Sequence, residues 1–245
     1  MKYVVTKIAG HVIELGAVSP KAVRRFSDFS SEEKPELFVH ITRERLDYEL
    51  IHYRAREKQP YLINERLEFV TLLRMLSETL IDYDTFLMHG AVIAADGKAY
   101  LFTAPSGTGK TTHIRQWLER LPGAFVVNGD KPFIKTSGDG TPPLACGSPW
   151  GGKENLYTDA MVPLKAVILM ERAEDNHMER VSFAEAFPTL LQQVYRPEDK
   201  GKMRKTLQLM QRLNPAVSFW RFRCNNFKPD CFDTAYSALT GEQAP

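Results

Sequence analysis

The sequence predicts an α/β fold built around a mixed β-sheet. Between residues 86 and 103, two apolar stretches flank an Asp-Gly turn signal, which predicts a hairpin of antiparallel strands. Further along the chain, apolar strand patterns alternate with amphipathic helices, which is typical of crossovers between parallel strands. The combination favours a mixed sheet over an all-parallel one, and an α+β arrangement of the same elements stays open.

Length and charge limit the kind of protein. The chain has 245 residues and a formal net charge of +2, so it is not an obvious nucleic-acid binder. We expect residues 1–82 to form a β-rich and helical extension packed on a core of residues 83–245. The three cysteines lack zinc-site spacing, and we find no signal peptide or membrane span. We therefore expect a cytoplasmic protein with reduced thiols and no membrane partner, and an oligomer is possible.

The N-terminal part reads as strands followed by a helix. Three short apolar stretches predict strands, the first two turning at Ala9-Gly10, and they cover residues 3–8, 11–15 and 36–41. Charged residues, serine and proline make residues 20–35 mainly a loop. Residues 65–81 carry a broad apolar face with helical spacing, which predicts a helix packed on a sheet.

The central part contains the hairpin and several further strands. Its strands are expected over residues 86–94 and 98–103, with the turn at Asp96-Gly97. Apolar positions Ile114, Trp117, Leu118 and Leu121 predict a helix that Pro122-Gly123 ends. Buried strands are predicted over residues 124–127 and 165–170, and two short strands around residues 137–140.

The C-terminal part is predicted to be helical. Ser182 and Glu185 form a capping-box pattern, but Pro188 conflicts with an uninterrupted helix, so we expect a late start or a kink. Two more amphipathic patterns predict helices over residues 203–213 and 232–239, and Gly241 ends the last one.

The most informative segment runs from Ala104 to Thr112. Its glycines let consecutive amides turn toward one anion, Lys110 supplies a charge for phosphates, and the Thr111 hydroxyl suits Mg²⁺. The strand before it and the helix after it are the context that a phosphate-binding loop requires. Ala104 replaces the usual first glycine, and a chance match in a Ser/Gly/Thr-rich turn is the alternative. The predicted nucleotide-binding residues are Pro105, Ser106, Gly107, Thr108, Gly109, Lys110, Thr111 and Thr112.

Asp130 and His89 are candidates for the chemistry beside this loop. Asp130 follows a predicted apolar strand, at the sheet edge where ligands of α/β proteins bind, and there it can reach a metal ion near Thr111. A plain turn aspartate is the alternative. His89 precedes Gly90, which suggests a close backbone approach, and a neutral imidazole beside Asp130 can orient a base. A hydrogen-bonded core histidine is its alternative.

Residues 148–154 form a third candidate segment. Lys153 can neutralise charge on a transferred phosphoryl group, Glu154 can serve as a second metal acid, and Trp150 can cover a substrate. A surface loop with a buried tryptophan explains the same residues equally well. Arg172 follows a predicted buried strand, where it either clamps phosphate or simply ends the strand.

Basic residues accumulate toward the C-terminus, between residues 200 and 228. They read either as solvated helix faces or as a surface that accepts an acidic substrate or a nucleotide phosphate.

Three segments together resemble the kinase domain of HPr kinase/phosphorylase and, more distantly, ATP-dependent phosphoenolpyruvate carboxykinase. The resemblance covers about residues 85–172, and the carrying segments are Met88–Val92, Pro105–Thr112 and Asn128–Pro132. The loop from Ser148 to Lys153 is similar to one in kinase-like members associated with lasso-peptide biosynthesis. The chain departs from the family at Gly129, where the first of two acids is often found.

The resemblance implies ATP- and Mg²⁺-dependent phosphoryl transfer on a mixed sheet around the phosphate loop. Lys110 and Thr111 would bind phosphate and metal, Asp130 would match the second family acid, and His89 the histidine before the loop. We expect a kinase acting on a hydroxyl, serine first of all, of a peptide or protein. A nucleotide-binding regulatory or assembly module without phosphotransfer, and a small-molecule hydroxyl kinase, are the alternatives.

Overall fold

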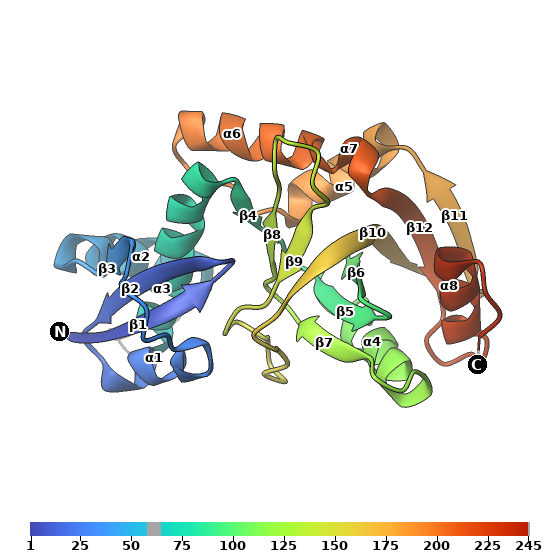
Figure 1. The fold of residues 1–245 in the computed structure, drawn as a ribbon, viewed down its shortest axis with the longest axis horizontal. Helices are drawn as coiled ribbons and strands as arrows, with labels where there is room; N and C mark the ends of the chain where they lie inside the picture. The colour runs from blue at the N-terminus through green and yellow to red at the C-terminus, as the bar shows by residue number, and fades with distance from the viewer. Residues whose placement is uncertain (58–64, 245) are drawn as a thin grey trace. The chain divides into compact units, whose positions relative to one another are not determined.

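The computed structural model describes residues 1–57 and 65–244, and the chain divides into two compact units, Met1–Tyr83 and Asp84–Pro245. Each unit combines helices with a sheet that contains both parallel and antiparallel strands (Figure 1). The predicted mixed α/β class is therefore confirmed.

The first unit holds a three-stranded sheet in the order β1-β2-β3. Its strands are β1 (Lys2–Ile8), β2 (His11–Ala17) and β3 (Leu37–His40). β1 and β2 form the predicted hairpin, and its turn residues Ala9 and Gly10 have positive φ angles of 52° and 81°. β3 lies parallel to β2.

Helical segments complete the first unit: α1 (Pro20–Arg24), the 3₁₀ turn η1 (Ser27–Phe29), α2 (Arg43–Glu57), α3 (Glu65–Leu80) and the 3₁₀ turn η2 (Ile81–Tyr83). The helix predicted over residues 65–81 is confirmed as α3. The predicted loop over residues 20–35 is wrong in its first half. The Ser19 hydroxyl accepts a hydrogen bond from the Lys21 amide at 3.2 Å, and Pro20 begins α1, because proline suits the first helical position.

A buried ion cluster joins α2 to α3. Glu49, whose side chain is 2% exposed, pairs with Arg45 at 3.0 Å and with Arg74 of α3 at 2.8 Å. Arg45 also pairs with Glu78 at 3.1 Å. Burying a carboxylate is costly unless it is paired, and here two guanidinium groups pair it. This cluster explains how α2, which has few apolar residues, is held against α3.

The second unit is built on a nine-stranded sheet in the order β4-β8-β9-β10-β6-β5-β7, with β12 beside β10 and β11 beside β12. β6, β10 and β12 run parallel, whereas β5 is antiparallel to both β6 and β7. The strands are β4 (Thr85–Leu87), β5 (Ala91–Ala95), β6 (Lys98–Thr103), β7 (Phe125–Asn128), β8 (Phe133–Lys135), β9 (Leu144–Cys146), β10 (Met161–Arg172), β11 (His177–Val181) and β12 (Ser218–Cys224).

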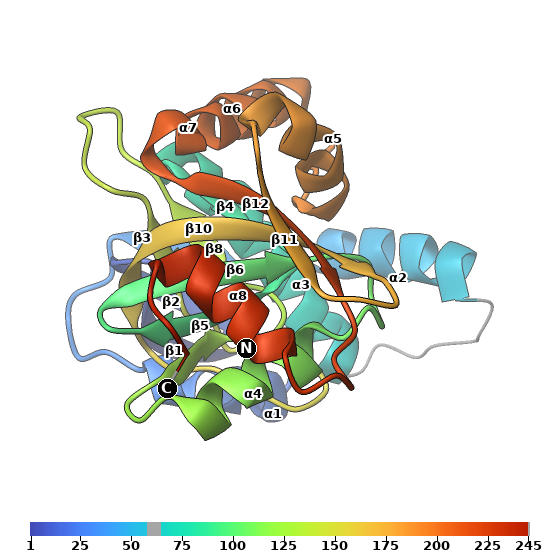
Figure 2. The same cartoon turned by 90° about the vertical axis from the view of Figure 1, so that its right-hand side faces the viewer.

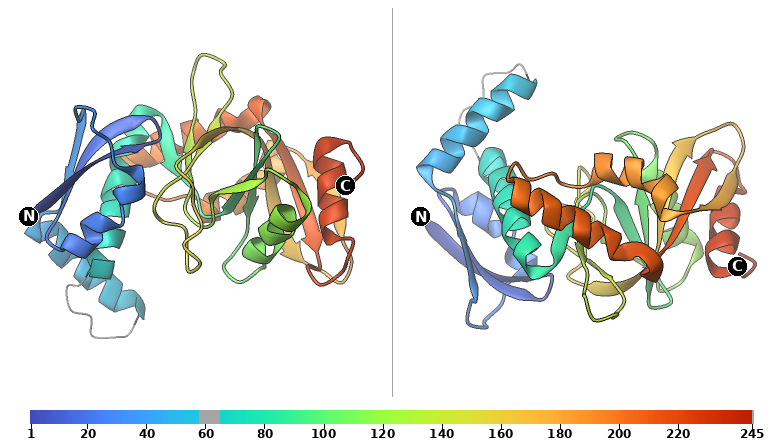
Figure 3. Two further views of the ribbon diagram at one scale, coloured as in Figure 1. Left: turned by 60° about the horizontal axis from the view of Figure 1, so that its bottom comes forward. Right: turned by 90° about the horizontal axis from the view of Figure 1, so that it is seen from above.

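Helices cover both faces of the central strands of this sheet (Figures 2 and 3). They are α4 (Lys110–Arg120), α5 (Phe183–Gln193), α6 (Lys200–Gln211), α7 (Leu213–Ala216) and α8 (Cys231–Thr240). α5 and α6 contribute to one core, with Leu190, Leu209, Val92, Leu101 and Val167. α4 and α8 contribute to the other, with Trp117, Phe232, Ile93, Phe102 and Ile168. Alternate residues of β5, β6 and β10 thus enter opposite cores, which explains their continuous apolar sequences.

The predicted hairpin is confirmed for β5 and β6, with positive φ at Asp96 and Gly97. Its first strand is nevertheless shorter than predicted, because β4 pairs with β8 and residues 88–90 separate β4 from β5. Gly90 lies in this break. A Cβ atom there would come within 2.9 Å of the Phe102 carbonyl oxygen, so the predicted close backbone approach is confirmed.

The C-terminal helices mostly follow the prediction. Ser182 caps α5, the capping box with Glu185 is present, and Pro188 lies inside the helix, so the expected late start is wrong. β11 and β12 were not predicted. Within the described part of the chain, no helix has both the length and the apolar character that crossing a bilayer requires.

Candidate functional site

Five segments meet at one edge of the large sheet. β6, β7, β10 and β12 point the same way, so their carboxyl ends share this edge, and antiparallel β5 begins there. Ligands of open α/β sheets bind outside this edge. In spatial order it carries Asp130 after β7, His89 before β5, residues 104–109 after β6, Arg172 at the end of β10, and residues 225–230 after β12. The topology thus collects residues that are far apart in the sequence.

The glycine-rich loop has the backbone that its sequence predicts. Gly107 and Gly109 have positive φ angles of 82° and 115°, a region that side chains disfavour, and Gly109 is the N-cap of α4. Ala104 is buried and is not among the described residues with positive φ. Alanine is therefore compatible with the position of the usual first glycine.

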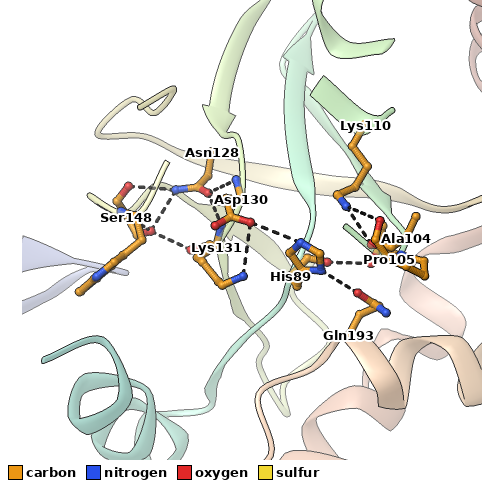
Figure 4. Close-up of polar contacts among 11 residues, drawn as sticks. His89, Ala104, Pro105, Lys110, Asn128, Asp130, Lys131, Ser148 and Gln193 are labelled. Atoms are coloured by element: carbon orange, nitrogen blue, oxygen red, sulfur yellow. Dashed lines mark hydrogen bonds and ion pairs between the residues drawn. The ribbon is translucent and has the colours of Figure 1, made fainter. Parts of the chain in front are cut away.

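Lys110 bends back over the loop that precedes it (Figure 4). Its Nζ donates hydrogen bonds to the carbonyl oxygens of Ala104, at 2.8 Å, and Pro105, at 3.2 Å. Burial lowers the pKa of Lys110, and the negative charge of Asp130 opposes that shift. The ammonium group is thus positioned at the loop by backbone carbonyls rather than by a carboxylate.

Asp130 and His89 form a pair beside the loop. His89 Nε2 lies 3.4 Å from Asp130 Oδ1, and Lys131 Nζ donates to the same oxygen at 3.3 Å. Burial alone raises the pKa of Asp130, but the hydrogen bond from His89 and the charge of Lys131 outweigh it, so the pKa is lowered. Both contacts use Oδ1, and no described residue bonds to Oδ2. Asp130 is therefore an ionised carboxylate with one oxygen available.

Two residues that were not predicted hold this pair in place. Gln193, at the end of α5, accepts a hydrogen bond from His89 Nδ1 at 2.7 Å through its side-chain oxygen. Asn128 is fully buried, and its Oδ1 accepts the backbone amides of Asp130, at 2.9 Å, and Lys131, at 2.6 Å. The Asn128 amide group donates to Ser148, which ties the turn to the segment after β9. The Asn128 bonds to the next amides are a local turn, whereas the contacts of Gln193 with His89 and of Asn128 with Ser148 join distant segments and could not be deduced from the sequence.

A cavity of about 430 Å³ brings most of the predicted residues together. Those that line it are His89, Ser106, Gly107, Gly109, Lys110, Thr111, Thr112, Asp130, Lys153 and Glu154. Pro105 and Thr108 belong to the same loop but do not line the cavity; the Thr108 hydroxyl donates to the Pro105 carbonyl at 2.9 Å.

In the segment after β9, some of the predicted residues lie at the cavity, and Trp150 lies in the core. Trp150 is buried, with its ring edge-to-face on Phe133 at 6.4 Å, so it is a core residue rather than a cover for substrate. Lys153 is exposed at the cavity. Glu154 also lines the cavity, but its carboxylate is ion-paired with Arg115 of α4. Of these residues, Lys153 has the side chain that is most accessible to a ligand.

Gly129 lies where the resembled family often has an acid. Its amide donates to the Leu156 carbonyl at 2.8 Å, and a Cβ atom would meet Gly151 O at 3.1 Å and Leu156 Cβ at 3.2 Å. The segment 151–156 therefore occupies the space that a side chain would need. The turn therefore carries one carboxylate, that of Asp130.

Among the described residues, no three His, Cys, Asp or Glu side chains form a metal cluster. Mg²⁺ does not need such a cluster at a nucleotide, because one or two protein oxygens, phosphates and water complete its octahedron. Thr111 and Asp130 line one cavity and supply a hydroxyl and a free carboxylate oxygen. These donors fit a Mg²⁺ ion that is bound together with phosphates.

The basic C-terminal residues do not line this cavity. Several are paired with carboxylates instead: Lys205 and Arg212 with Asp84, Arg221 with Glu179, and Lys228 with Asp175. Arg172 is different, since its guanidinium donates to the carbonyl of Gly107 in the glycine-rich loop.

The chain matches no protein-family model, and no curated protein is significantly similar to it in sequence. Its function is therefore argued from the residues at this sheet edge.

Proposed function

We propose that the protein is an ATP- and Mg²⁺-dependent kinase of the HPr kinase-like type, which transfers the γ-phosphate to a hydroxyl of a peptide or protein. The observation that carries the proposal is that a free Asp130 oxygen and the glycine-rich loop with Lys110 line one cavity. A kinase needs both a phosphate cradle and a carboxylate beside it.

In this proposal Asp130 has two tasks and each of the other residues has one. The amides of the loop and Lys110 bind the phosphates, while Thr111 and Asp130 would hold Mg²⁺, which would neutralise charge during transfer. Asp130 accepts the proton of the attacking hydroxyl, and His89, whose Nε2 lies 3.4 Å from Asp130 Oδ1, orients the carboxylate. Lys153 stabilises the charge on the transferred group.

The packing around Gly129 supports catalysis by a single acid. Segment 151–156 packs closely on this position, where a Cβ atom would have contacts of 3.1–3.3 Å, so the turn is formed around glycine rather than around an empty side-chain site. The geometry thus favours an intact one-carboxylate site over a binding module without phosphotransfer.

A small-molecule hydroxyl kinase is the second candidate. A groove for an acidic peptide would require the basic C-terminal residues to line the cavity. They do not line it, and several of them pair with carboxylates instead, which favours this candidate. Both candidates use the same phosphate chemistry and differ only in the acceptor.

Transfer of ³²P from γ-labelled ATP tests the proposal. The wild type is incubated with Mg²⁺ and either degenerate peptides with a fixed Ser, Thr or Tyr, or a panel of polyols and sugars. We expect labelled peptide, with Ser preferred, and no label with Lys110→Ala. Label on a polyol alone supports the second candidate. Tight ATP binding without transfer to any acceptor or to water contradicts both.

A further inference from the structure

We infer that the loop of residues 225–230 is a nucleobase subsite, in which the Phe227 ring stacks on the base of the bound nucleotide. The inference rests on the proposed nucleotide function and adds a binding residue to it. No sequence pattern singled out this loop, which follows a strand that was not predicted.

The order of strands fixes the direction in which the nucleotide extends. β7 and β5 bring Asp130 and His89 to one side of the glycine-rich loop, and β10 and β12 lie on its other side. A terminal phosphate beside Asp130 therefore directs the nucleoside end toward β10 and β12. Arg172, at the end of β10, donates to Gly107 and lies along this direction.

The loop after β12 is in direct contact with the glycine-rich loop. Asn226 Nδ2 donates to the Gly109 carbonyl at 3.1 Å, and Gln116 of α4 donates to the Asn226 carbonyl at 3.0 Å. A Cβ atom at position 109 would clash with Asn226 Nδ2. The residue after Asn226 is thus held next to the beginning of α4.

That residue presents an aromatic ring to solvent from a hydrogen-bonded turn. Phe227 is 94% exposed, the most of any large apolar side chain in the described part of the chain. Its amide donates to Asn225 Oδ1 at 3.1 Å, and the Lys228 amide donates to the Asn225 carbonyl at 3.0 Å. Asn176 Oδ1 in turn accepts the Asn225 amide at 2.7 Å. These bonds hold the backbone that carries the ring, which limits the entropy that binding costs.

Aromatic rings beside phosphate sites suit nucleobases, because every base has a π-face and stacking tolerates different bases. The larger face of a purine gains most from such a contact. The subsite therefore predicts a preference for purine over pyrimidine nucleotides, with little discrimination between adenine and guanine.

Calorimetric titration with two ligands tests the subsite separately from the phosphate site. Mg·ATP carries the base, whereas Mg·tripolyphosphate carries only the phosphates. We expect Phe227→Ala to weaken Mg·ATP binding about 5- to 100-fold and to leave tripolyphosphate binding unchanged. Phe227→Tyr should retain the ATP affinity, because it keeps the aromatic face. Phe38→Ala, which removes a 62%-exposed ring in the other unit, is the matched control.

The outcomes separate the two proposals. If tripolyphosphate binds but Phe227→Ala binds ATP like the wild type, the subsite is wrong and the phosphate site stands. Equal affinity of the wild type for ATP and tripolyphosphate also contradicts the subsite. If the wild type binds neither ligand, the proposed function fails and the subsite fails with it.

Discussion

His89 lies in the break between β4 and β5, where its Nε2 is 3.4 Å from Asp130 Oδ1 and its Nδ1 is 2.7 Å from Gln193 Oε1. The backbone reinforces this arrangement, since the His89 amide donates to the Gln193 carbonyl at 2.8 Å and the Gly90 amide to the Asp130 carbonyl at 3.0 Å. The imidazole is thus fixed from both sides and presents Nε2 to the carboxylate.

Replacing Asp130 by Asn should abolish most phosphoryl transfer while the phosphate loop still binds nucleotide. The amide cannot accept the hydroxyl proton and is a poor Mg²⁺ ligand, so we expect a loss of about 10²–10⁴-fold in turnover. Asp96→Asn is the matched control, because Asn-Gly suits the exposed hairpin turn as well as Asp-Gly does. Steady-state turnover and ATP affinity are measured for both variants. Wild-type turnover in Asp130→Asn would remove this carboxylate from the mechanism.

Gln193 is a positioning residue in this account. Gln193→Ala removes the acceptor at His89 Nδ1, and the loss of one hydrogen bond should lower turnover about fivefold. Gln193→Glu keeps an acceptor oxygen, so it should restore turnover, whereas a purely structural role would not distinguish the two variants in this way. The readout is turnover of each variant beside its melting temperature. Equal turnover in Ala and Glu variants of equal stability would contradict the role.

Restoring an acid at position 129 should harm the protein rather than help it. The Cβ of Gly129→Asp meets Gly151 and Leu156, and forcing a side chain into packed space costs about 1–3 kcal/mol. The melting temperature should fall by about 2–4 °C for each kcal/mol. Gly138→Asp is the control, because a Cβ there has only the Arg212 side chain nearby, at 3.8 Å. A Gly129→Asp variant with unchanged stability and higher turnover would show that the first acid is missing.

His113 makes the stability of the second unit depend on pH. It is fully buried behind the glycine-rich loop, where Nε2 accepts a hydrogen bond from Trp117 at 3.1 Å, and burial lowers its pKa from 6.5 to about 3. Below pH 6.5 the unfolded chain binds a proton that the folded chain does not bind until about pH 3. The free energy of unfolding due to this group therefore falls as the pH falls through that window.

Denaturant unfolding at several pH values checks this dependence. Between pH 6.5 and 5 the loss should be about 2 kcal/mol, and His113→Gln should remove it. His177→Gln, an exposed histidine on β11, should leave it unchanged. An identical pH dependence in His113→Gln would show that another group is responsible.

Sequence patterns that depend on neighbouring residues predicted the elements that form locally. Asp96-Gly97 predicted the hairpin, and the spacing of Ile114 and Trp117 predicted α4, because turns and amphipathic helices depend on neighbouring residues. β12 was missed since its pairing partners, β10 and β11, lie far away in the sequence. α2 was missed because its polar sequence leaves little apolar periodicity, and a buried ion cluster holds it instead.

The same distinction explains the site. The sequence predicts a place in the site for Lys110, Thr111 and Asp130, because each belongs to a recognisable motif that follows a strand. Gln193 and Asn226 reach the site from α5 and from the loop after β12, and their neighbours in the sequence give no indication of this. Their roles follow from topology, which brings the ends of β5, β6, β7, β10 and β12 to one edge.

The central claim is that the amides beside Lys110 bind a polyphosphate. Titration of Mg·ATP into the wild type and Lys110→Ala tests it most directly, with circular dichroism to show that both are folded. The account predicts saturable binding by the wild type and a loss of at least about tenfold in the variant, because Lys110 supplies the charge for the phosphates. Equal affinity of the two folded proteins for Mg·ATP, or no binding by the wild type, would contradict it.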